Sequence, residues 1–220
     1  PLPGRSQNRL LRNRGAAAPG FFEDDTQVAG VELENLPGVP TSALGTPGFS
    51  PGIVDLDGDG WPELTWVADW GTSRLFWNVG DGTFTDGTVA ANVGTERSGM
   101  GSTLDDFDGD GRLDWMTTSI FGRLDEIRYG VSNQLYINGG ARTFTNLSAT
   151  SGIADGGFGW GLSGFDFDND GDQDVVQTNG FLETGHEQYD LWANDRTRLF
   201  ENDGSGAFTE VGVAHGITDA

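Results

Sequence analysis

Three copies of one acidic loop contain the residues of this chain whose type and spacing are best suited to chemistry. In each copy, carboxylates stand at positions 1, 3, 5 and 9 and a glycine occupies position 6. Side chains from every second residue can converge where the backbone turns sharply at this glycine, and such clusters of oxygen atoms suit Ca²⁺. The copies read Asp55-Leu-Asp-Gly-Asp-Gly-Trp-Pro-Glu63, Asp106-Phe-Asp-Gly-Asp-Gly-Arg-Leu-Asp114 and Asp166-Phe-Asp-Asn-Asp-Gly-Asp-Gln-Asp174.

We predict one Ca²⁺ in each loop, three in all, held by the carboxylates, water and the backbone carbonyl at position 7. Like charges this close repel one another unless a hard cation or protons neutralise them. Magnesium demands a stricter octahedron, and the loops contain no imidazole or thiolate that would favour zinc or copper. The expected ligands are Asp55, Asp57, Asp59, Trp61 and Glu63; Asp106, Asp108, Asp110, Arg112 and Asp114; and Asp166, Asp168, Asp170, Asp172 and Asp174.

Two other interpretations of these loops are weaker. A single acidic stretch of this kind is often a solvated surface turn, but three copies in register count against that interpretation. An EF-hand needs a bidentate glutamate at position 12, where the three copies have Trp66, Thr117 and Gln177.

The elements that must position the loops repeat with them, in units of about 50 to 65 residues. A small-residue strand precedes each loop, a hydrophobic strand follows it, and a third strand ends in an asparagine that opens a glycine-bearing turn. Four short strands for each unit predict an all-β fold of β-propeller blades, each of four antiparallel strands. The chain then supplies about three and a half blades: a partial blade and connection at 1–47, and blades at 48–95, 96–154 and 155–220.

The units also end alike, which predicts a special backbone conformation. Gly30, Gly152 and Gly216 occupy equivalent positions near the ends of their units, and Asn92 stands there in the remaining unit. Asparagine is the residue that best replaces glycine at positive φ. We therefore expect a left-handed residue at this position in every unit.

Composition and charge narrow the range of partners. The chain has 36 glycines, 14 phenylalanines and seven tryptophans, as tight turns and flat β packing require, and its net charge is −22. This charge argues against nucleic acid or an anionic membrane as a partner, and no stretch is long enough for a membrane-spanning helix. The opening arginines, Arg5, Arg9, Arg12 and Arg14, are interpreted as a solvated strand edge in preference to a binding tail.

These residues resemble the FG-GAP/VCBS repeats of integrin α-subunit heads and of many secreted bacterial proteins. The pattern Asn-Arg-Leu-x-x-Asn, Gly-x-Phe-Thr and Ala-x-x-Gly-Ile is most similar to the ASPIC/UnbV and cartilage acidic protein branch, over residues 8–217. The resemblance implies Ca²⁺ between the first two strands of each blade and a ring of seven blades. Glu63 departs from the family's aspartate, which implies a wider or weaker first site. Three and a half blades imply a segment of a longer chain, or, alternatively, two copies that close one ring.

The connections between the second and third strands differ most in length among the units. They contain four residues in the first unit, 13 in the second and 17 in the third. Insertions confined to one loop of a repeat usually mark a binding face, for a protein or a glycan, although they can also cover a neighbouring blade or another domain. The candidate contacts in them are Tyr129, His186, Tyr189 and Trp192.

Two motifs that could suggest an enzyme do not hold. The G-x-S-x-G sequence at residues 48–52 has Pro51 where an oxyanion-hole amide is needed, and Asp190 replaces the second histidine after His186-Glu187. We therefore predict a non-catalytic module for adhesion or protein interaction; the alternative is a calcium-dependent carbohydrate-binding propeller, either a lectin or the non-catalytic part of a polysaccharide-active enzyme. Because extracellular modules bind calcium with dissociation constants of about 10⁻⁴ to 10⁻³ M, we expect a secreted, cell-surface or periplasmic protein.

Overall fold

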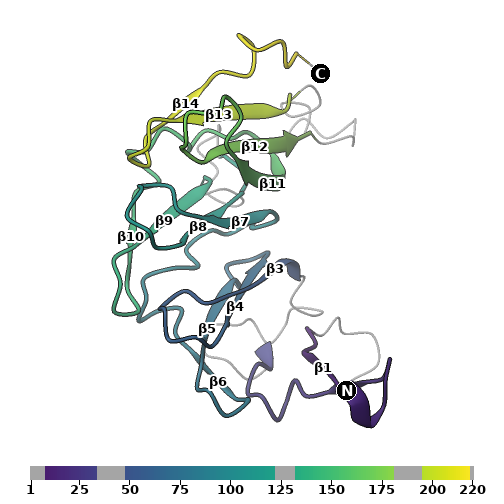
Figure 1. Cartoon of the computed structure of the whole chain (residues 1–220). Helices are drawn as coiled ribbons and strands as arrows, with labels where there is room; N and C mark the ends of the chain where they lie inside the picture. Colours follow the sequence, from purple (N-terminus) through teal and green to yellow (C-terminus); the bar gives the residue numbers. More distant parts are fainter. Residues whose placement is uncertain (1–7, 34–47, 122–131, 181–194, 219–220) are drawn as a thin grey trace.

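The computed structural model describes residues 8–33, 48–121, 132–180 and 195–218. Within them, the chain forms a two-stranded sheet and then three four-stranded antiparallel sheets, each from consecutive strands. The sheets form a row from β1 at one end to β14 at the other (Figure 1). In the described part of the chain, no helix is long and apolar enough to cross a membrane.

Each four-stranded sheet is one blade, with its strands in sequence order. This confirms the predicted all-β fold built from four-stranded antiparallel propeller blades. The first blade has β3 (Gly48–Val54), β4 (Glu63–Ala68), β5 (Arg74–Asn78) and β6 (Phe84–Asp86); the second has β7 (Ser102–Asp105), β8 (Asp114–Thr117), β9 (Gln134–Asn138) and β10 (Phe144–Asn146); the third has β11 (Gly159–Phe165), β12 (Asp174–Asn179), β13 (Arg198–Asn202) and β14 (Phe208–Glu210).

The hydrophobic core lies between neighbouring blades. Strands β5, β8 and β9 are buried at every residue, because these middle strands have packed side chains on both faces of their sheets. Trp77 of the first blade packs in one cluster with Trp115 and Tyr136 of the second, whose two rings lie 5.6 Å apart. Phe107 of the second blade meets Phe208 of the third edge to face at 5.7 Å. Face-to-face packing of this kind explains why the middle strands are continuous runs of large side chains.

A two-stranded hairpin precedes the first blade. It consists of β1 (Leu11–Asn13) and β2 (Phe22–Asp24), with a 3-10 turn (Gly15–Ala17) between them. Arg9 pairs with Asp24 at 3.3 Å, and Arg12 pairs with Asp25 at 2.6 Å. The exposed arginines thus pair with acidic residues of their own hairpin, as expected of a solvated strand edge; Arg5 lies outside the described residues.

The predicted left-handed residues are present at all four unit ends. Gly30, Gly152 and Gly216 have φ values of 76°, 89° and 82°, and Asn92 has φ of 63°. At Gly152 a Cβ atom would lie 2.1 Å from the carbonyl oxygen of Phe208, so any side chain would force a shift there. The substitution at Asn92 is tolerated because asparagine adopts this conformation more readily than most residues.

Candidate metal-binding loops

Each acidic loop connects the first two strands of its blade and is fixed by its own side chains. The first aspartate bonds the backbone amides that close the turn: Asp55 Oδ1 accepts from the Gly58 amide at 2.8 Å and Oδ2 from the Gly60 amide at 3.0 Å. Asp57 and Asp59 each accept from the amide two residues further along, at 3.1 and 2.8 Å. Glycines at positions 4 and 6 supply the positive φ that this winding needs, and in the third loop Asn169 takes position 4 with φ of 63°. Short local turns therefore shape the loop before any cation is considered.

The carboxylate at position 9 lies under the loop and is buried. Asp114 is 0 % exposed, and its two oxygens accept two backbone bonds, from the Phe107 amide at 2.9 Å and from the Asn138 amide at 2.7 Å. Phe107 is in the loop, whereas Asn138 ends the third strand of the same blade. One side chain thus joins the loop to β9.

The other two blades repeat this arrangement. Glu63 accepts from the Leu56 amide at 2.8 Å and from the Asn78 amide at 3.3 Å. Asp174 accepts from the amides of Phe167 and Asn202 at 3.0 and 2.8 Å. The sequence predicted position 9 only as a metal ligand and missed this structural role. The signal was present in the asparagine that ends the third strand of every blade, although its distance from the loop varies from 15 to 28 residues.

That asparagine also links neighbouring blades. The Asn138 Nδ2 group donates to the carbonyl of Leu56 in the preceding blade at 2.8 Å and to Leu113 in its own blade at 3.1 Å. Asn202 likewise donates to Phe107 of the preceding blade at 2.9 Å. The backbone of the first and second loops is therefore held by the blade that follows.

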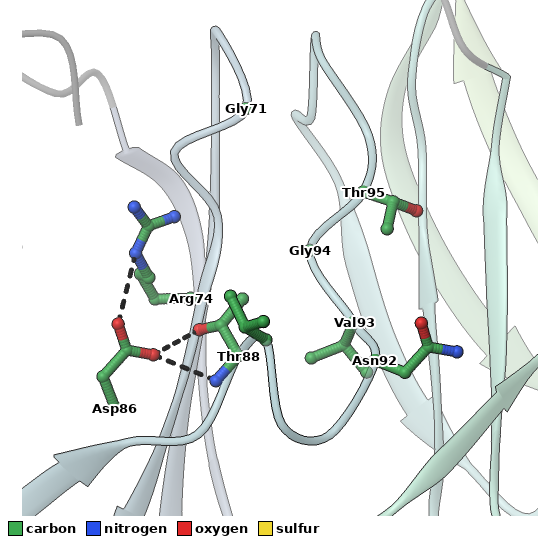
Figure 2. Close-up of a pocket in the computed structure, with 9 residues that line it drawn as sticks. Gly71, Arg74, Asp86, Thr88, Asn92, Val93, Gly94 and Thr95 are labelled. Atoms are coloured by element: carbon green, nitrogen blue, oxygen red, sulfur yellow. Dashed lines mark hydrogen bonds and ion pairs between the residues drawn. The ribbon is translucent and has the colours of Figure 1, made fainter. Parts of the chain in front are cut away.

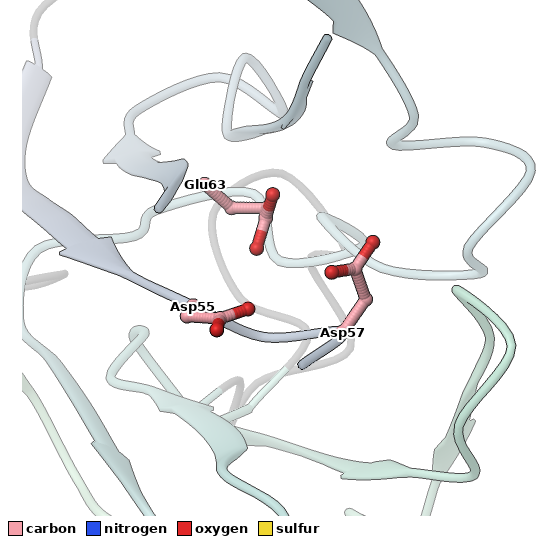
Figure 3. A group of neighbouring side chains, drawn as sticks. All are labelled: Asp55, Asp57 and Glu63. Carbon is pink, nitrogen blue, oxygen red and sulfur yellow. The ribbon is translucent and has the colours of Figure 1, made fainter. Parts of the chain in front are cut away.

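Three convergent groups of carboxylates result. Ligand atoms of Asp55, Asp57 and Glu63 lie within 4.8 Å of one another, and the carboxylates face a common centre (Figure 3). The second and third groups are Asp106, Asp108 and Asp114, and Asp166, Asp168 and Asp170, within the same limit. The structure therefore brings together positions 1, 3 and 9 in the first two loops but positions 1, 3 and 5 in the third. Asp59, Asp110, Asp172 and Asp174 lie outside these tight groups, and the position-7 carbonyls of Trp61, Arg112 and Asp172 remain predicted ligands.

The electrostatics of these groups suit a hard cation. Burial raises the pKa of Asp114 to about 6, against the opposing effect of the hydrogen bonds from Asn138 and Phe107. Burial likewise raises the pKa of Glu63, and burial together with the charge of Asp110 raises the pKa of Asp108. A raised carboxylate pKa means that the ionised form lacks compensating positive charge. Because every donor atom is oxygen, the residues present fit Ca²⁺.

A cavity of about 330 Å³ lies at the other end of the first blade. Gly71, Arg74, Asp86 and Thr95 are among its lining residues (Figure 2). Asp86 accepts from the Thr88 amide and hydroxyl at 2.9 and 2.6 Å, and Arg74 donates to the Ser73 carbonyl at 2.7 Å. These polar groups are thus engaged with the protein itself, and the cavity is separate from the acidic loops.

The remaining predicted site residues cannot be placed. Tyr129, His186, Tyr189 and Trp192 all lie outside the described residues. The G-x-S-x-G sequence lies within β3, where Ser50 pairs with Val67, and so it is not the sharp strand-to-helix turn that a nucleophile of that motif needs.

Comparison with known proteins agrees with this geometry. Residues 55–117 match the model of the FG-GAP-like repeat, from the first aspartate of the first loop to the end of β8. No curated protein matches the chain. Among solved structures, the chain is similar to an Agrocybe aegerita lectin whose structure describes specific recognition of non-reducing terminal N-acetylglucosamine, with 19 % identity and a TM-score of 0.43. The match covers 73 % of this chain and 36 % of the lectin, so the chain spans about a third of that protein. Residues 55–117 therefore match FG-GAP-like repeat sequence, and they lie within the first two four-stranded blades.

Proposed function

We propose that this chain is a calcium-stabilised β-propeller segment that serves as an extracellular adhesion or protein-interaction module without catalytic activity. The observation that carries the proposal is the convergence of three carboxylates in each of three loops, with raised pKa values at Glu63, Asp108 and Asp114. Bound Ca²⁺ would neutralise their mutual repulsion. Residues 55–63, 106–114 and 166–174 would supply the oxygen ligands.

The expected location follows from the affinity of such sites. Extracellular calcium modules have dissociation constants of about 10⁻⁴ to 10⁻³ M, far above cytosolic calcium levels. At a free calcium concentration about 100 times the dissociation constant, each site would contribute about 2.7 kcal/mol of stability. Three such contributions would rival the net stability of a typical domain, about 5–15 kcal/mol. The protein would accordingly work where calcium is plentiful, as a secreted, cell-surface or periplasmic protein.

A further blade is the partner that we propose for the outer face of the third blade. The asparagine of each following blade bonds the loop carbonyl of Leu56 or Phe107, and the equivalent residue in the third loop is Phe167. Phe167 is only half-buried, whereas Leu56 and Phe107 are buried, and Phe165, whose ring lies 6.5 Å from that of Phe167, is 41 % exposed. A blade of the same kind, from the same chain or from another copy, would cover this apolar surface. Its asparagine would donate to the carbonyl of Phe167, as Asn138 and Asn202 donate to Leu56 and Phe107.

A carbohydrate ligand is the alternative. The sequence insertions between the second and third strands contain Tyr129, Tyr189 and Trp192, and aromatic rings suit stacking on sugars. A glycan array with wild type and Trp192→Ala separates the two hypotheses. Sugar binding that the substitution removes favours a lectin, whereas no binding across the array favours a protein partner.

Metal analysis after dialysis against about 20 mM calcium, about 20 times the upper end of the expected dissociation constants, tests the proposal. We expect three Ca²⁺ per wild-type chain and two for Asp168→Asn, which removes one convergent carboxylate of the third loop. The control is Asp81→Asn, because Asp81 accepts only from the Thr83 amide and hydroxyl in its own turn. It should retain three ions. A wild-type protein without bound calcium would refute the proposal.

A further inference from the structure

Arg142 stands where the corresponding turns of the other two blades have glycine. The turns after β5 and β13 have Gly82 and Gly206 at this position, with φ of 92° and 77°. Arg142 adopts φ of 61° in the same place. A left-handed conformation costs a residue with a side chain about 1–2 kcal/mol. The contacts that the arginine makes must therefore offset this cost.

Its contacts are with the acidic loop of the preceding blade. The Nε atom of Arg142 lies 2.6 Å from Asp57 Oδ2, and Nη2 lies 3.3 Å from Asp59 Oδ2. The guanidinium also lies over the ring of Trp77, 5.1 Å from its centroid. Asp57 belongs to the convergent group of the first loop, and its side chain is only 9 % exposed. A positive charge from the second blade thus already binds a carboxylate that a metal ion would need.

The other two loops lack this charge. In the second loop, Arg112 pairs with Asp110, but Asp110 lies outside the convergent group of Asp106, Asp108 and Asp114. The third loop has Asp172 where the second has Arg112, and no ion pair to its carboxylates occurs among the described residues. The third loop is therefore the most negative, and among the described residues only the first loop has a positive charge on a member of its convergent group.

We propose that Arg142 is a built-in counter-ion that makes the first loop the weakest of the three calcium sites. The inference rests on the proposed function, namely that the loops bind calcium. A cation that enters the first loop must displace the guanidinium from Asp57, whereas the third loop offers five carboxylates without such competition. The order of affinity is then third loop, second loop, first loop. When calcium is scarce, Arg142 keeps the first and second blades joined through the loop that the ion has left.

The first loop can be tested alone in an Asp108→Asn/Asp168→Asn background, in which the other two loops each lose a convergent carboxylate. Calorimetry with Ca²⁺ in this background should show one weak site. Addition of Arg142→Gly, which restores the residue of the other turns, should tighten this site by about two- to tenfold, as expected for loss of partly exposed ion pairs. The tightening should shrink at high salt, because salt screens the competing guanidinium.

Arg14→Gln is the matched control, because Arg14 pairs with Glu23 in the N-terminal hairpin, far from the loops in the chain. It removes the same charge and should leave the affinity of the first site unchanged. Unchanged or weaker binding in Arg142→Gly, or equal tightening in Arg14→Gln, would overturn the inference while leaving the calcium sites in place. If wild type binds no calcium at all, the proposed function fails first, and the inference fails with it.

Discussion

The carboxylates on the rim of each loop and the carboxylate beneath it have the same chemistry in opposite surroundings. Rim residues such as Asp108 and Asp110 accept local bonds from nearby backbone amides and are half-buried or exposed. The residues beneath the loops are Glu63, Asp114 and Asp174, and each is at most 1 % exposed and joins its loop to the third strand of its blade. The comparison teaches that one repeated motif can divide its acidic residues between a proposed cation site and construction of the blade.

Removal of a carboxylate beneath a loop should have the largest effect. Asp114→Ala leaves the amides of Phe107 and Asn138 without their acceptors inside the protein. Each orphaned amide costs about 1–3 kcal/mol, and relief of the buried charge offsets part of this, so we expect a net loss of about 2–4 kcal/mol. Urea denaturation in the presence of chelator measures it.

The matched rim variant is Asp108→Ala. It should change stability by less than about 0.5 kcal/mol in chelator, as most substitutions away from buried features do. Its destabilising effect should appear only when calcium is added, because the loop then lacks one of its proposed ligands. Equal destabilisation of the two variants in chelator would abolish the distinction between rim and base.

The asparagine that links neighbouring blades should have the next largest effect. Asn138→Ala removes bonds to Leu56 of the preceding blade and to Leu113, whereas the Asn78 side-chain amide donates to Pro62 in its own blade. We expect Asn138→Ala to cost about 1–2 kcal/mol and Asn78→Ala less. Thermal unfolding of both variants in chelator gives the difference, and a larger loss for Asn78→Ala would contradict the inter-blade role.

A position remote from the rim should respond independently of calcium. Asn92→Gly relieves the left-handed conformation of a residue with a side chain and should stabilise the chain by about 0.5–1 kcal/mol. The gain should be equal with calcium and with chelator. A gain that appears only with calcium would mean that this turn, too, responds to the cation.

A pH dependence of stability should accompany these effects. Burial raises the pKa of Asp69 from 3.8 to about 6, and Asp69 lies at the end of β4 opposite the acidic loops. The folded state therefore binds more protons than the unfolded state between these values, so the free energy of unfolding should fall as pH rises through about 6. Asp69→Asn should flatten this slope, and calcium should not.

Asp114 should behave differently, because its pKa of about 6 belongs to a carboxylate within reach of the proposed ion. In chelator it should add to the same downward slope. Bound calcium favours the ionised carboxylate and should remove this contribution. Denaturation curves of Asp69→Asn at several pH values, with and without calcium, measure the contribution of Asp114 to the pH dependence of the free energy of unfolding. A slope unchanged by calcium would contradict its place at the site.

Features set by nearby residues could be predicted from the sequence. The turns of the loops depend on aspartates and glycines within a few residues of one another, and the left-handed Asn92 follows from its place among equivalent glycines. The order of strands within each blade followed from the repeat. Local turn chemistry and hydrophobic periodicity therefore sufficed for the blades and for most of the acidic groups.

Features set by a neighbouring blade could not be predicted. Asn138 lies 82 residues beyond Leu56, and Arg142 lies 85 beyond Asp57, so only packing of one blade against the next brings them together. The grouping of Asp170 with Asp166 and Asp168 in the third loop differs from the other loops, although the spacing of the three motifs is the same.

A calcium titration of the chelator-stripped chain, with heat and melting temperature followed together, tests the central claim most directly. We expect three ions per chain and a melting temperature that rises with calcium, because ions that bind only the folded state stabilise it. Absence of binding heat together with an unchanged melting temperature would contradict the account and leave the rim aspartates as solvated turns.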